Sequence, residues 1–114
     1  MLRGELFQAN LDPIIGSEQG GKRPVLIVSR NALNANLPIV IVVPLTGREN
    51  KTRPYPTHVE LRAGEGGLAK DSIVLCEQVR AVSKSRLKRK IGQIGPQALS
   101  LVEAKMKIAF DMSP

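Results

Sequence analysis

Two runs of β-branched and aliphatic residues constrain the fold of this chain more than any other feature of its sequence. The first run is PVLIVS, residues 24–29, and the second is PIVIVVPLT, residues 38–46. Apolar runs of this kind, bounded by polar turn residues, are typical of buried strands. Pro24 agrees with this interpretation, because the N–H that a proline lacks is not yet needed at the first position of a strand.

The remaining sequence predicts further short strands and a C-terminal helix. Strands are expected at residues 4–10, 57–61, 73–76, 78–82 and 88–95, with polar turns between them. One helical turn is expected within 30–36, and Ser83 is placed to cap a short turn.

The C-terminal helix is expected to begin at Pro96, because proline is well tolerated at the first helical position. Leu99, Val102, Met106 and Ala109 recur at helical spacing and predict a side that faces the core. About seven short strands followed by one helix favour a mainly β fold, a small and strongly curved antiparallel barrel. Its length of 114 residues indicates a single domain over 1–114.

Charge is the compositional feature that bears most on function. Seventeen Lys and Arg against ten Asp and Glu give a net charge of +7. Such a surplus favours a polyanionic partner, most often a nucleic acid, although it also serves solubility. Only Phe7, Tyr55 and Phe110 are aromatic, which argues against a surface of several stacking rings.

The single cysteine, Cys76, cannot form an intrachain disulfide and fits a reducing compartment. No apolar run of about 18 residues is present to span a membrane. The first ten residues, MLRGELFQAN, lack the apolar segment of a signal peptide. We therefore expect a cytoplasmic protein that does not bind a membrane.

The chemistry-bearing residues exclude several kinds of enzyme. The sequence has no phosphate-binding P-loop and no dinucleotide-binding glycine motif. His58 and Cys76 are each the only residue of their type, and the acidic residues are scattered, so neither a zinc site nor a two-metal site is expected. RNA cleavage stays open without metal or cofactor, because the 2′-OH of RNA is itself a nucleophile that only needs orientation and charge stabilisation.

The segment GSEQGGKR, residues 16–23, places polar side chains directly before the first apolar run. Pro24 and the strand behind it would fix Arg23, whose planar guanidinium can pair with two phosphate oxygens. Glu18 and Gln19 are candidates for reading base edges. Thr46, at the end of the second apolar run, is a candidate to place a hydroxyl beside Arg23. The alternative is a flexible loop in which Arg23 is an ordinary solvated charge.

Five segments carry a family resemblance along nearly the whole chain. They are GELF (4–7), DPIIGSEQGGKRPVLIVS (12–29), VVPLT (42–46), PTHVEL (56–61) and DSIVLCEQVR (71–80). In order and spacing they resemble the MazF/PemK family of toxin endoribonucleases. One departure is Phe7, where relatives often carry Trp.

The resemblance implies an SH3-like barrel with a C-terminal helix, working as a homodimer. It implies metal-independent cleavage of single-stranded RNA at short sequences, leaving a 2′,3′-cyclic phosphate and a 5′-OH, without a cofactor. It also implies a cognate, MazE-like antitoxin protein that covers the RNA groove.

Residue by residue, the resemblance implies that Arg23 and Thr46 are catalytic. We favour charge stabilisation as the main role of Arg23, because a guanidinium that stays protonated is a poor base. The residues that fall on or beside the implied RNA path are Ser17, Glu18, Gln19, Lys22, His58, Glu77, Gln78 and Arg80.

Two other functions stay open at this point. One is a non-enzymatic toxin similar to CcdB, which shares this barrel and inhibits DNA gyrase through protein contacts. The other is a plain nucleic-acid-binding barrel, in which Arg23 and Thr46 would be idle. The basic residues within 84–90 are either a solvated surface or a source of sequence-independent attraction for phosphates.

Overall fold

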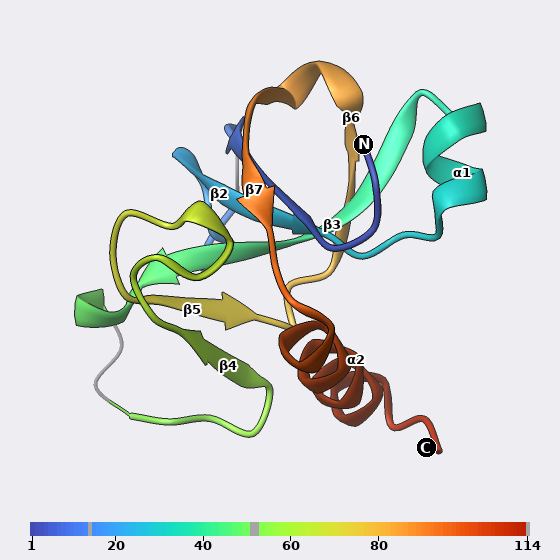
Figure 1. Cartoon of the computed structure of the whole chain (residues 1–114). Helices are drawn as coiled ribbons and strands as arrows, with labels where there is room; N and C mark the ends of the chain where they lie inside the picture. Colours follow the sequence, from blue (N-terminus) through green and yellow to red (C-terminus); the bar gives the residue numbers. More distant parts are fainter. Residues whose placement is uncertain (14, 51–52, 114) are drawn as a thin grey trace.

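The computed structural model describes residues 1–13, 15–50 and 53–113, in which seven strands and two α-helices form (Figure 1). The strands are β1 (Glu5–Asn10), β2 (Lys22–Ile27), β3 (Ile39–Gly47), β4 (His58–Leu61), β5 (Ser72–Leu75), β6 (Arg80–Ser83) and β7 (Leu87–Gln93). The helices are α1 (Asn31–Asn36) and α2 (Pro96–Phe110), and three 3₁₀ turns are η1 (Arg48–Asn50), η2 (Glu65–Gly67) and η3 (Lys84–Arg86). The predicted mainly β fold with a C-terminal helix is confirmed.

All seven strands belong to one antiparallel sheet with the order β4-β5-β3-β2-β1-β7, and β6 pairs with β3. β3 is the longest strand and organises the sheet. Its first half, residues 39–42, pairs with β6, and its last residues, 45–47, pair with β5. One strand therefore joins two parts of a strongly curved sheet, as Figure 1 shows.

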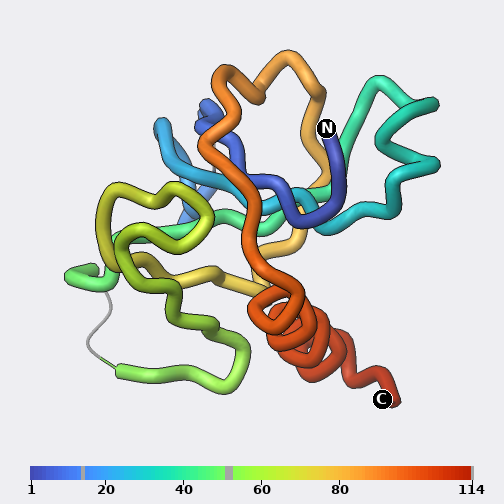
Figure 2. The backbone as a smooth tube through the Cα atoms, viewed as in Figure 1, coloured from blue at the N-terminus to red at the C-terminus, as the bar shows by residue number. Residues whose placement is uncertain are grey.

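The two ends of this strand order, β4 and β7, do not pair with each other within the described ranges. The turn η2 packs against β7 instead, and α2 lies against β4 (Figures 1 and 2). The contact at β7 is so close that a Cβ atom on Gly92 would overlap the carbonyl oxygen of Gly66. In the described residues the curved sheet is therefore not closed by a pair of strands, and η2 covers its β7 edge while α2 covers β4.

Both faces of β2 are covered, which explains why its sequence is continuously apolar rather than alternating. Val25 and Ile27 belong to one cluster of buried residues, and Leu26 belongs to the other, which also holds Val102 of α2. Cys76 is fully buried in this second cluster, as predicted, and burial raises the pKa of its thiol to about 12.

The predicted inner side of α2 is correct for its first three turns but wrong at the end. Val102 is buried, and Leu99 and Met106 are half-buried against the core. Ala109 is exposed, as are its neighbours Ile108 and Phe110, because the last turn of the helix projects beyond the sheet (Figure 1).

The other helical expectations agree with the structure. Pro96 occupies the start of α2, and the Ser83 hydroxyl accepts a hydrogen bond from the Ser85 N–H at the start of η3. Neither α2 nor any other helix in the described part of the chain is long and apolar enough to cross a membrane.

Glu5 is a buried carboxylate that links the N-terminus to β7. It accepts hydrogen bonds from the Leu2 N–H and from Lys90 Nζ, each at 2.6 Å, and the terminal amine lies 3.8 Å away. Burial alone would raise the pKa of Glu5. The hydrogen bonds from Lys90 and Leu2 and the nearby positive charges outweigh this effect, so the pKa lies below the ordinary 4.5.

A carboxyl group with a lowered folded-state pKa stabilises the fold above its ordinary pKa, and this stability is lost as the pH falls through the folded-state pKa. We expect Glu5→Gln to lower the free energy of unfolding by about 1–3 kcal/mol at neutral pH. The difference from wild type should shrink on acidification below 4.5, when followed by denaturant titrations. Glu60→Gln, which changes an exposed ion pair with Arg48, is the control and should have little effect at either pH.

Candidate active site

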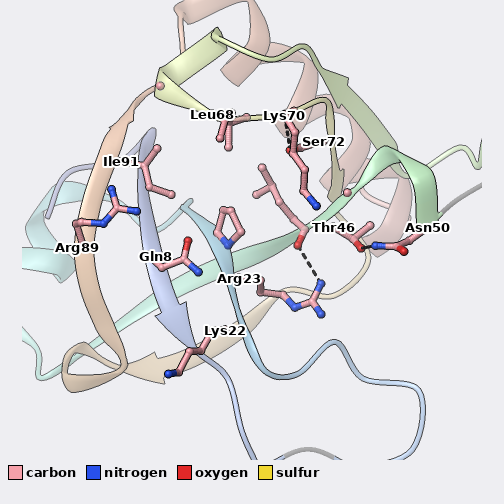
Figure 3. Close-up of a pocket in the computed structure, with 15 residues that line it drawn as sticks. Gln8, Lys22, Arg23, Thr46, Asn50, Leu68, Lys70, Ser72, Arg89 and Ile91 are labelled. Carbon is pink, nitrogen blue, oxygen red and sulfur yellow. Dashed lines mark hydrogen bonds between the residues drawn. The ribbon is translucent and has the colours of Figure 1, made fainter.

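An open pocket lies where the ends of β2 and β3 meet the segment after η2. It has a volume of about 500 Å³, and its lining includes Arg23, Thr46 and Lys22. Figure 3 shows Thr46, Asn50, Lys70 and Ser72 on one side, and Gln8, Arg89 and Ile91 on the other. The structure therefore brings both sequence-predicted catalytic residues into one open pocket.

Strand register explains why Arg23 and Thr46 are neighbours. β2 and β3 pair Leu26 with Val43 and Val25 with Pro44. Two residues beyond this last pair, the same register leads to Arg23 on one strand and Thr46 on the other. Arg23 Nη1 then donates a 3.2 Å hydrogen bond to the carbonyl oxygen of Leu45, which ties the two strand ends together.

The loop before β2 holds the other side of the Arg23 guanidinium. Arg23 Nε donates a 2.6 Å hydrogen bond to the carbonyl oxygen of Gly20. The next residue, Gly21, has a φ of 73°, a conformation that favours glycine, and its N–H donates to Asp12 Oδ1 at 2.8 Å. Two backbone carbonyls thus orient the guanidinium plane, and Nη2 has no hydrogen-bond partner among the described residues. Arg23 is therefore a fixed group rather than a freely solvated loop charge.

The Thr46 hydroxyl is buried at the floor of the pocket and is oriented by a residue that the sequence did not single out. Asn50 Nδ2 donates a 3.1 Å hydrogen bond to Thr46 Oγ1. The turn η1 brings Asn50 back over the strand end, and the Arg48 N–H donates to the carbonyl oxygen of Asp71 to hold this turn. With its oxygen accepting from Asn50, the hydroxyl can direct its own hydrogen toward a ligand.

Four cationic side chains line the pocket, namely Lys22, Arg23, Lys70 and Arg89. Only Lys70 has an ion-pair partner among the described residues, Glu49 Oε1 at 2.9 Å. The pocket is therefore suited to an anionic group such as a phosphate. Lys70, Arg89 and Gln8 were not predicted as site residues, because none lies in the quoted motifs that carry the resemblance.

Most of the other predicted RNA-binding residues line a second, smaller pocket of about 280 Å³. These are Ser17, Glu18, Gln19, Glu77, Gln78 and Arg80. The Gln19 N–H donates a 2.9 Å hydrogen bond to Gln78 Oε1, so the two Glu-Gln pairs of the sequence meet in space. Lys22 lines the first pocket instead, and His58 lines neither of the two.

Glu18 and Arg80 are bonded differently within the second pocket. Glu18 Oε1 accepts a 2.8 Å hydrogen bond from the Ile15 N–H, so part of its carboxylate closes its own loop. Arg80 Nη1 is buried without a hydrogen-bond partner in the described residues. Such a donor is costly to bury unless a water or ligand oxygen satisfies it.

The structure does not place His58 in either pocket. His58 Nε2 lies 3.8 Å from Glu77 Oε2, and its ring packs edge-to-face on Tyr55, with centroids 5.7 Å apart. The Thr57 hydroxyl donates a 2.8 Å hydrogen bond to the other oxygen of Glu77. His58 therefore touches the second pocket only through Glu77.

No group of three or more His, Cys, Asp and Glu side chains in residues 1–13, 15–50 and 53–113 lies together in a way that could hold a metal ion. Glu49, next to the first pocket, accepts a hydrogen bond from Lys70 Nζ.

Comparison with known proteins identifies a family that matches both the sequence and the fold. A family model described as the PemK-like, MazF-like toxin of type II toxin–antitoxin systems matches residues 2–110. The chain is 41% identical over 112 residues to the endoribonuclease MazF of Staphylococcus saprophyticus, covering 98% of this chain and 92% of that protein.

Solved structures of similar proteins have the same fold as this chain. MazF from Deinococcus radiodurans superposes with a TM-score of 0.84 at 28% identity, covering 98% of this chain and 97% of that one. An endoribonuclease from a mycobacterial species, solved with its cognate antitoxin, superposes with a TM-score of 0.81 at 24% identity, covering 100% and 98%. With a matching sequence model over almost the whole chain and a matching fold, this chain belongs to the PemK-like, MazF-like family of type II toxin–antitoxin toxins.

Proposed function

We propose that this protein is an endoribonuclease that cuts single-stranded RNA without a metal ion and acts as the toxin of a toxin–antitoxin pair. One observation carries the proposal: the guanidinium of Arg23 and the hydroxyl of Thr46 project from adjacent strand ends into one cationic pocket. The 41% identity to an endoribonuclease MazF supports the same activity.

The reaction that fits this pocket uses the nucleophile of the RNA itself. The 2′-oxygen forms a bond to the adjacent phosphorus, and the bond from phosphorus to the 5′-oxygen breaks. The proton of the 2′-OH is released, and the leaving 5′-oxygen takes up a proton, which gives a 2′,3′-cyclic phosphate and a 5′-OH. DNA lacks the nucleophile and would not be cut.

In this reaction Arg23 would bind the non-bridging phosphate oxygens as negative charge develops on them. Its plane is already fixed by Gly20 and Leu45, so no reorganisation is needed at that moment. The Thr46 hydroxyl, held by Asn50, would donate a hydrogen bond to the same phosphate group. The second pocket would contact bases along the strand and contribute to the choice of sequence.

The proposed assembly is a homodimer whose RNA groove is covered by a MazE-like antitoxin in the inactive complex. Among the similar structures are an endoribonuclease with its cognate antitoxin and a MazE–MazF complex from Deinococcus radiodurans. A net charge of +7 would attract an acidic antitoxin segment. We place the protein in the cytoplasm, where its buried thiol and its RNA substrate both fit. A non-enzymatic gyrase inhibitor would have no use for the fixed Arg23 and Thr46.

The experiment that tests this function is cleavage of a long single-stranded RNA after treatment of protein and RNA with EDTA, followed by mapping of both product ends. We expect discrete cuts that end in a 2′,3′-cyclic phosphate and a 5′-OH. If folded, antitoxin-free protein makes no cuts with or without added Mg²⁺, the ribonuclease function is wrong. Cuts that require Mg²⁺ would overturn its metal independence.

Thr46→Val removes the hydroxyl while keeping the shape of the side chain, and we expect it to lower kcat by about 10–100-fold. Thr46→Ser keeps the hydroxyl and should retain most of the activity. Single-turnover cleavage of a mapped RNA would measure both variants. Equal activity of the valine variant and wild type would remove Thr46 from the mechanism.

A further inference from the structure

The five basic side chains within residues 84–90 differ in their bonding. They are Lys84, Arg86, Lys88, Arg89 and Lys90. Four of them are bonded to other groups of the protein, and one is not. Lys90 pairs with Glu5, Lys88 Nζ donates to the Ser85 carbonyl, Lys84 Nζ donates to the Asn34 carbonyl, and Arg86 Nη1 donates to the Asn10 and Asp12 carbonyls. Arg89 is exposed and has no side-chain partner in the described part of the chain.

Arg89 points into the first pocket from the wall that faces Thr46 and Asn50 (Figure 3). It is paired across the sheet with Gln8 of β1, and directly paired residues present their side chains on the same face. Ile91, two residues further along β7, also lines the pocket on this side. Arg89, Gln8 and Ile91 therefore form one continuous wall of the pocket.

Apolar side chains lie beside the polar ones in this part of the pocket. Ile91, Leu68 and Pro24 line the pocket beside the two polar side chains. Leu68 is almost fully buried, while Ile91 and Pro24 are half-buried and accessible from the pocket. An arginine with five donors, an amide with both donors and an acceptor, and an apolar surface match the phosphate, the polar edge and the ring face of a nucleotide.

We propose that Arg89, Gln8 and the surface of Ile91 form a nucleotide subsite next to the scissile phosphate. The proposal rests on the proposed function, since the ligand is a nucleotide of the same RNA strand whose scissile phosphate lies at Arg23. Arg89 binds the phosphate that neighbours the cut with paired hydrogen bonds, Gln8 bonds the base edge or the sugar, and the ring face covers Ile91. The strand thus passes between two walls of the pocket rather than across Arg23 and Thr46 alone.

Binding of an uncleavable probe tests the subsite apart from the chemistry. The probe is a fluorescent oligodeoxyuridylate of about eight nucleotides, which lacks the attacking 2′-OH, and its Kd is measured by fluorescence anisotropy at fixed low salt. Arg89→Gln removes the proposed phosphate ligand. Lys88→Gln is the matched control, because it removes the same charge from the neighbouring residue of β7, which does not line the pocket.

We expect Arg89→Gln to weaken binding about tenfold, as loss of a charge-assisted hydrogen-bonded contact does, and Lys88→Gln to change the Kd by less than about threefold. Arg89→Lys should recover only part of the loss, because an ammonium keeps the charge without the planar fork. Thermal unfolding of each variant checks that the fold is intact.

Equal weakening by Arg89→Gln and Lys88→Gln, or full recovery by Arg89→Lys, would show general attraction of phosphates and overturn the subsite. No binding of the probe by wild type would overturn it as well. These outcomes differ from a failure of the proposed function, which would appear as absence of RNA cleavage by wild type whatever the ratio of the Kd values.

Discussion

Arg23→Ala is expected to lower RNA cleavage at least about 10²–10³-fold, while the protein stays folded. The activity falls because the variant loses the guanidinium that is held beside Thr46 at the end of β3. Arg23→Lys should also be strongly impaired, since a lysine cannot bond Gly20, Leu45 and two phosphate oxygens with one planar group. Cleavage of a mapped RNA under single-turnover conditions measures all three proteins.

The control for Arg23→Ala is Arg30→Ala, which removes the same charge from an exposed residue at the start of α1 whose side chain makes no capping hydrogen bond. It should cleave RNA nearly as well as wild type. Thermal unfolding of the two variants should agree to within a few degrees. If Arg30→Ala reduces cleavage as much as Arg23→Ala, the loss reflects net charge and Arg23 has no special role.

Gly92→Ala is expected to lower the free energy of unfolding by about 3 kcal/mol. A methyl group at this position would meet the backbone carbonyl of Gly66, and a backbone atom cannot move aside as the end of a flexible side chain can. The expected result is separation of η2 from β7. Because Gly67, Leu68 and Ala69 line the first pocket, cleavage should fall together with stability.

Gly95→Ala is the matched control, since a Cβ atom there has no heavy atom within 4 Å and its φ of −73° suits any residue. It should be neutral or slightly stabilising, because alanine has less backbone freedom to lose on folding. Urea titrations of the two variants give the comparison. A stability for Gly92→Ala equal to that of Gly95→Ala would mean that η2 and β7 are not held as closely as described.

The strands of this fold could be predicted from the sequence because their signals are local. The apolar runs at 24–29 and 38–46 identify β2 and β3, whose paired ends then place Arg23 near Thr46. The helix pattern correctly gave the side of α2 that faces the core. It gave no information on where the sheet beneath the helix ends, and for this reason Ala109 was assigned to the core wrongly.

The rest of the site depends on contacts that a sequence pattern does not encode. Whether Arg89 faces the pocket depends on its register with Gln8, more than eighty residues away, and that pairing is shifted by irregularities on both sides of Gln8. A shift of one residue would turn Arg89 to the other face. Asn50 orients Thr46 only because η1 folds back over the end of β3. The RNA-contacting role that the resemblance implies for His58 stays a prediction, and the sequence did not indicate that its ring packs on Tyr55 and lies near Glu77.

Because Cys76 is fully buried, the rate at which a reagent modifies its thiol reports unfolding of the core. With a pKa of about 12, the thiol holds almost no reactive thiolate at neutral pH, and no solvent reaches it in the folded chain. An alkylating reagent can therefore label it only when the core around Val102 and Val74 separates. The labelling rate of this one sulfur, read by mass spectrometry, measures how often the toxin unfolds and how far a bound antitoxin suppresses that unfolding.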